Sequence, residues 1–210
     1  MLFVVAWAMA EGPNALATAP PAAPVVVEND PRNPTVGNMG ARFTIAEWSD
    51  FQCPHCAGAW RDVENFIGSN ADVRLVFMSY PISNACNPAI EGIRHENACY
   101  AARAAICASD QGKFAALADQ MFGNQDYLDP EQIGFMAQKV GVNAKKFASC
   151  LTAKSTAALV SRDIEAAIAA GLQGTPTFFL RDGVGPWRPQ DEGLAAMFAE
   201  IVHLRGALQP

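Results

Sequence analysis

Charged residues are scarce in this chain of 210 residues, and their arrangement excludes one broad class of partner. Only 17% of the residues are Asp, Glu, Lys or Arg, and the formal net charge is −6. The sequence contains no cluster of Lys and Arg, which a nucleic-acid-binding domain needs to neutralise phosphates. We therefore expect no nucleic-acid partner. Half of the residues are apolar, which indicates a folded core and argues against disorder.

A hydrophobic run long enough to cross a bilayer is also missing. The apolar stretch Leu2–Met9 is far too short to span a membrane. Ala8-Met9-Ala10 has the small-x-small form of a signal cleavage site, but the basic region that should precede it is absent. Two interpretations stay open: a clipped or mis-started export signal, or the tail of a preceding membrane segment. Residues 11–24, rich in Ala and Pro, resemble a tether.

The chain contains one motif with strong chemical meaning, Cys53-Pro54-His55-Cys56. It follows a run of strand-forming residues, Phe43–Trp48, and opens a helical pattern that continues to Ile67. A helix N-terminus offers unpaired N–H groups and partial positive charge, which favour a thiolate at Cys53. Pro54 suits the first helical position, and His55 can further stabilise the thiolate. The pattern predicts Cys53 as nucleophile and Cys56 as resolving thiol; a structural bond or half a zinc site are the alternatives.

A second motif, Gly174-Thr175-Pro176-Thr177-Phe178-Phe179, lies about 120 residues downstream. Together the two motifs resemble the DsbA-like branch of the thioredoxin superfamily. The resemblance implies that Pro176 is cis and that the Thr175 backbone, with Pro176 and Pro54, contacts substrate. It also implies that Glu47 is a buried acid exchanging protons near Cys56. The alternative for Glu47 is a strand residue that faces solvent.

The remaining pattern predicts an α/β fold. Val73–Met78 is typical of a buried strand, so residues 43–78 form a β-α-β unit. Residues 86–170 have a helical pattern, in which Asp129-Pro130 marks a helix start. The chain then predicts a strand at Thr177–Leu180, a hairpin to residues 184–188 and a last helix at 191–205. Residues 25–27 are a candidate edge strand, and residues 29–40 a loop.

These elements match a thioredoxin fold with an inserted helical domain. We predict a signal-like segment and tether at residues 1–24. The thioredoxin-fold domain then comprises residues 25–82 and 171–210, and the inserted helical domain residues 83–170.

Four further cysteines, Cys86, Cys99, Cys107 and Cys150, could form two structural disulfides in three possible pairings. A Cys86–Cys99 bond would close a loop of about 15 residues and contribute about 3 kcal/mol. His95-x3-Cys99 also has metal-ligand spacing, and reduced buried thiols are the third possibility. Cys107 with Cys150 is the second pair by elimination only. Such cysteine usage favours an oxidising compartment.

The sequence therefore predicts a thiol:disulfide oxidoreductase that introduces disulfides into exported proteins. The resemblance implies the periplasm or another envelope compartment, reduced or unfolded exported proteins as substrates, and reoxidation by a quinone-linked membrane partner. It implies no cofactor and no metal, and a monomer. The alternatives are a disulfide isomerase or reductase, and a metal-binding or chaperone module.

Overall fold

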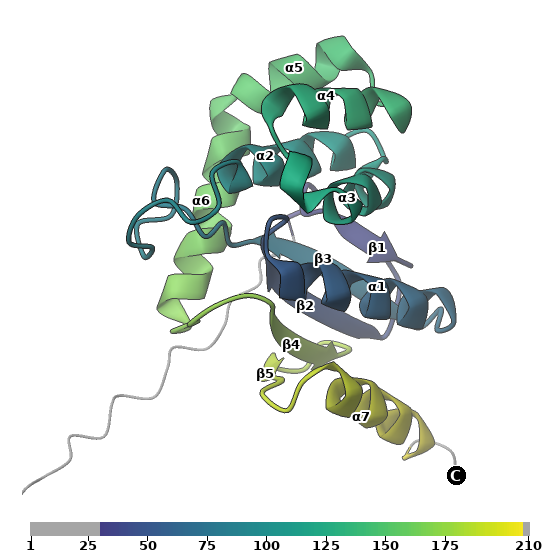
Figure 1. Ribbon diagram of the computed structural model, residues 1–210. Helices are drawn as coiled ribbons and strands as arrows, with labels where there is room; N and C mark the ends of the chain where they lie inside the picture. Colours follow the sequence, from purple (N-terminus) through teal and green to yellow (C-terminus); the bar gives the residue numbers. More distant parts are fainter. Residues whose placement is uncertain (1–29, 208–210) are drawn as a thin grey trace, which may run out of the picture.

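The computed structural model describes residues 30–207 as a five-stranded mixed sheet with helices on both faces (Figure 1). The strand order is β1-β3-β2-β4-β5, in which only β2 and β3 are parallel. The predicted signal-like segment, tether and strand at residues 25–27 lie outside the described residues. None of the helices within residues 30–207 is long and apolar enough to cross a bilayer.

The predicted β-α-β unit is confirmed. β2 (Phe43–Ser49) and β3 (Val73–Ser79) pair in parallel, and α1 (Pro54–Gly68) is the crossover between them. β2 is buried along its whole length because helices cover both faces of the sheet. α1 begins directly after Cys53 with Pro54 at its first position, where the missing N–H costs no hydrogen bond.

The edge strand next to β3 lies where the sequence predicted a loop. β1 (Thr35–Gly37) pairs antiparallel with β3. Gly37 has a φ of 96°, and a Cβ at this position would lie 2.8 Å from the carbonyl oxygen of Val73. Glycine therefore permits the close approach of the two strands, which a composition typical of loops had hidden.

The C-terminal hairpin is shorter than predicted. β4 (Thr177–Asp182) pairs with β2, but β5 consists of Arg188–Pro189 alone, so the strand predicted at residues 184–188 is wrong in extent. Trp187, in the proline-containing segment before β5, packs against Arg181 of β4. The guanidinium carbon of Arg181 lies 4.5 Å from the centre of the Trp187 ring. α7 (Leu194–Gly206) closes the fold.

Five α-helices and a short 3-10 helix lie between β3 and β4. Their bounds are α2 (Ala98–Ser109), α3 (Phe114–Gly123), η1 (Gln125–Tyr127), α4 (Pro130–Lys139), α5 (Ala144–Thr152) and α6 (Lys154–Ala169). The helix start at Asp129 is confirmed, since its carboxylate accepts hydrogen bonds from two backbone N–H groups of α4. Residues 86–97 are not helical as predicted, because Pro88 and Gly92 interrupt them. The proposed domain boundaries stay a prediction.

Two hydrophobic clusters sandwich the sheet. One lies under α1 and α7 and continues into the inserted helices, with Phe43, Trp60 and Ile201 among its members. The other lies under α6 and contains Trp48 and Ile164. Figure 1 shows α1 across the middle strands β3 and β2 and α7 below β4 and β5, while α2–α5 stack beyond the opposite edge of the sheet.

Both predicted disulfide pairs are present, Cys86–Cys99 and Cys107–Cys150. The first ties the irregular segment 80–97 to α2, and the second ties α2 to α5. Because Cys99 is bonded to Cys86, it is not a metal ligand with His95, and the metal interpretation of this spacing is wrong for this state.

Candidate active site

The two motif cysteines lie where β2 passes into α1. Both are free thiols; Cys53 is 7% exposed and Cys56 is fully buried. Cys53 occupies the position before the first helical turn, and its carbonyl oxygen accepts the N–H of Cys56 at 3.1 Å. The first sulfur is therefore the one that a second molecule can reach, as the sequence predicted.

The pKa of Cys53 is lowered to about 5. The largest cause is a hydrogen bond from the Cys56 thiol, and donors at the helix start, the N–H groups of Cys56 and His55, add to it. Partial burial opposes the shift. The His55 contribution comes from its backbone rather than from the imidazole that the sequence suggested, since the side chain is exposed.

The pKa of Cys56 is shifted in the opposite direction, far above the ordinary value. Burial is the main cause, and the hydrogen bond to Cys53 adds to it because it favours the protonated thiol. The pair therefore holds one thiolate and one thiol at neutral pH. Such asymmetry stabilises the reduced form and so makes the disulfide form a stronger oxidant.

The second motif meets the first in space. The Thr175–Pro176 peptide bond is cis, and the Cys53 thiol lies 3.6 Å from the carbonyl oxygen of Thr175. Pro176 lies opposite the start of α1, and β4 begins at the next residue. The sequence separation of about 120 residues is closed by the pairing of β4 with β2.

Glu47 is fully buried on β2, so the solvent-facing alternative is wrong. Burial is the main cause that raises its pKa to about 7, and the charge of Cys53 adds to the shift. Among the described residues, neither Glu47 oxygen nor the Ser49 hydroxyl has a hydrogen-bond partner of standard geometry. Ser49, two residues after Glu47 on β2, lowers the pKa of both Glu47 and Cys56.

We expect Glu47→Gln to remove a pH-dependent destabilisation. The folded protein binds the Glu47 proton more tightly than the unfolded chain, so stability is lost as the pH rises from 4.5 to about 7. At about 1.4 kcal/mol per pKa unit, the variant should gain roughly 3 kcal/mol over the wild type across this range. Urea denaturation at pH 4 and pH 8, with the Cys53–Cys56 pair reduced in both proteins, measures the difference. An equal stability difference at both pH values would contradict a raised pKa.

Three side chains at the site were not predicted to act there. Asp50, at the end of β2, is buried and accepts hydrogen bonds from the N–H groups of Gln52 and Ile82. His95 donates its Nδ1 proton to the same carboxylate at 2.8 Å. Gln125, from η1, donates to the carbonyl oxygens of Phe51 and Cys53. Only His95 had drawn attention in the sequence, for its spacing to Cys99, because these contacts join residues far apart in the chain.

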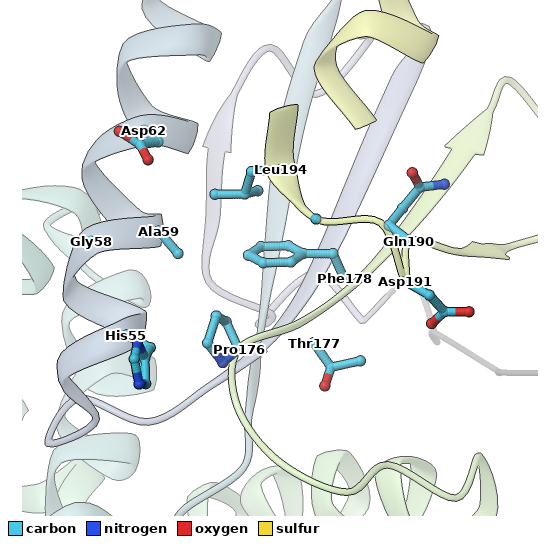
Figure 2. Close-up of a pocket in the computed structure, with 11 residues that line it drawn as sticks. His55, Gly58, Ala59, Asp62, Pro176, Thr177, Phe178, Gln190, Asp191 and Leu194 are labelled. Carbon is cyan, nitrogen blue, oxygen red and sulfur yellow. The ribbon is translucent and has the colours of Figure 1, made fainter. Parts of the chain in front are cut away.

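A groove of about 520 Å³ opens beside the motif, between α1, the Pro176 loop and the segment that enters α7. Figure 2 shows His55 and Pro176 at one end and Leu194 with Phe178 further along. The polar side chains of its rim include Asp62, Gln190 and Asp191. Pro54, predicted to contact substrate, is exposed at the start of α1.

The metal-binding alternative requires several ligand side chains gathered at one place. No group of three or more His, Cys, Asp or Glu side chains that could hold an ion occurs among residues 30–207. Four of the six cysteines are disulfide-bonded. Cys53 and Cys56 remain available for exchange with a thiol or disulfide of another molecule.

The sequence model of the thioredoxin family matches residues 29–198. Among solved structures, a thioredoxin-like oxidoreductase from Silicibacter pomeroyi DSS-3 is 26% identical, with a TM-score of 0.64, over 83% of this chain and 94% of that one. DsbA2 of Pseudomonas aeruginosa is 21% identical, with a TM-score of 0.64, over 85% and 97% of the two chains. The predicted fold, family resemblance and enzyme class agree with these findings.

A curated relative carries a different name. The Na⁺/H⁺ antiporter NhaA 3 of Salinispora tropica is 30% identical over 178 residues, which cover 83% of this chain but 26% of that protein. The chain thus spans about a quarter of the length of that relative.

Proposed function

The chain belongs to the thioredoxin family, and from this premise we propose that it is a thiol:disulfide oxidoreductase that introduces disulfides into exported proteins. The observation that carries the proposal is the asymmetry of the cysteine pair. Cys53 is slightly exposed with a pKa of about 5, whereas Cys56 is buried with a raised pKa. A pair with these properties gives its disulfide away readily.

The reaction begins with the oxidised Cys53–Cys56 pair. A substrate thiolate attacks Sγ of Cys53, so the bond to Cys56 breaks and Cys56 leaves with the electron pair and takes up a proton. A second substrate thiolate then attacks the substrate sulfur of the mixed disulfide and releases Cys53 as a thiolate. Two electrons pass to the enzyme, one proton stays on Cys56, and the other is released.

The surroundings of Cys53 suit an extended polypeptide. The Thr175 backbone borders the sulfur, and the adjoining groove offers both the apolar ring of Phe178 and polar groups at its rim. A reduced or unfolded exported protein is therefore the proposed substrate. We assign the protein to the periplasm or another envelope compartment, where its two disulfides are stable. A quinone-linked membrane protein is the proposed acceptor of the two electrons.

The test is the equilibrium of the Cys53–Cys56 couple with a glutathione series, together with two refolding assays. We expect an oxidant of the glutaredoxin range or stronger, with fast disulfide formation in a reduced substrate and slow repair of a scrambled one. A couple as reducing as thioredoxin, or fast repair of scrambled substrate, would support the reductase or isomerase instead. Stoichiometric zinc that disappears in Cys53→Ser would support the metal-binding module.

A further inference from the structure

His95 comes to the site from the irregular segment between β3 and α2. The Cys86–Cys99 disulfide ties this segment to α2, and the N–H of His95 donates to the carbonyl oxygen of Ile82. Its Nδ1 donates to Asp50 Oδ2 at 2.8 Å. Backbone, disulfide and carboxylate together fix one imidazole in one place.

Asp50 links this imidazole to the nucleophile. The Asp50 carboxylate is completely buried, while its backbone carbonyl oxygen accepts the N–H of Cys53 at 3.0 Å. His95 itself keeps 23% of its side chain exposed, so it can exchange protons with solvent. The described residues offer no hydrogen-bond partner to its second ring nitrogen, Nε2.

We propose that Asp50 holds the imidazole of His95 near Cys53, so that this imidazole takes up a proton and becomes a cation as Cys53 becomes a thiolate. This inference rests on the proposed function and adds to it an imidazole from outside the Cys53–Cys56 motif. In the reaction above, reduction of the pair releases one proton. At pH values between the His95 pKa of the oxidised protein and that of the reduced protein, His95 takes up this proton before it reaches solvent, which leaves a paired cation and anion rather than an isolated thiolate.

The charges around His95 agree with this assignment. Asp50 and the Cys53 thiolate both raise the pKa of His95, with the Asp50 hydrogen bond as the larger cause, and partial burial and Arg94 lower it. A charge that raises the pKa of an imidazole is in turn stabilised by the imidazolium, because the coupling is reciprocal. His95 acts through Cys53 and is therefore a positioning residue.

The decisive variant is His95→Asn. Its amide nitrogen can replace Nδ1 as donor to Asp50, so the segment keeps its anchor while the charge is lost. We expect the pKa of Cys53, followed by thiolate absorbance, to rise by roughly 0.3 unit. The equilibrium constant for oxidation of glutathione should then fall about twofold at pH values where His95 is charged. At pH values above the His95 pKa the difference should vanish.

His203→Asn is the matched control, because His203 is exposed on α7 and should leave both quantities unchanged. A merely structural His95 would lower the melting temperature without moving the pKa of Cys53, and this result would overturn the inference. A wild type that does not oxidise substrate would instead overturn the proposed function, while the Cys53 titration would still judge the role of His95.

A second measurement needs no variant of the site. The chain has three histidines, so each can be followed by NMR titration of the wild type. We expect the His95 pKa to be higher in the protein with a reduced Cys53–Cys56 pair than in the oxidised protein. Equal values in the two states would show that the imidazole does not respond to the thiolate, and would overturn the inference.

Discussion

Cys53→Ser should abolish disulfide transfer, with a loss of roughly a thousandfold or more, because serine cannot form the mixed disulfide. Cys56→Ser should instead stop the reaction halfway. Its Cys53 thiolate can still attack glutathione disulfide, but the buried thiol that would resolve the mixed disulfide is missing. Mass spectrometry of the variant after exposure to glutathione disulfide should therefore detect one stable adduct at Cys53.

The two variants are each other's control. Both replace one sulfur with oxygen in the same turn, so both should unfold at similar urea concentrations while they differ in adduct formation. An adduct on Cys56 in the Cys53→Ser variant would contradict the assignment of the accessible nucleophile. So would full transfer activity in either variant.

Removal of the Cys107–Cys150 disulfide should have the largest effect on stability. The two cysteines are 43 residues apart, and a loop of this size corresponds to about 4 kcal/mol of chain entropy in the unfolded state. Cys86 and Cys99 are 13 residues apart, for which the same relation gives about 3 kcal/mol. The double variant Cys107→Ala/Cys150→Ala should therefore be less stable than Cys86→Ala/Cys99→Ala.

Urea denaturation of the two double variants without reductant measures this order. Each variant is compared with the wild type in its oxidised form, so that the Cys53–Cys56 pair is in the same state throughout. A loss below about 1 kcal/mol for the longer loop would contradict the entropic account. Disulfide transfer should persist in the Cys107→Ala/Cys150→Ala variant, because neither residue touches the site.

The elements that position the cysteines could be predicted because their signals are local. The strand before Cys53, the proline after it and the stripe of buried residues on α1 lie within 25 residues of each other. Pro176 could be placed through its motif alone. The resemblance to DsbA-like proteins also predicted that Glu47 is buried. It did not predict that the Glu47 carboxylate lacks hydrogen bonds of standard geometry.

What escaped prediction depends on contacts between distant segments. β1 exists because the free edge of β3 accepts it, and Gly37 lets the backbones approach. Pro88 and Gly92 interrupt the helix predicted at residues 86–97. The non-helical conformation of this segment is then fixed by contacts with Asp50, Ile82 and Cys99. No local pattern announces that a histidine of this segment will reach an aspartate 45 residues earlier.

The hydrogen bonds of Gln125 have a consequence for how the active site can move. Its Nε2 donates hydrogen bonds to the carbonyl oxygens of Phe51 at 2.7 Å and Cys53 at 2.9 Å. These bonds link the helices between β3 and β4 to the loop that carries the Cys53 sulfur. An outward movement of those helices would therefore displace this sulfur. We therefore expect any widening of the active site on its other side, where β5 is two residues long and the segment before α7 lines the groove.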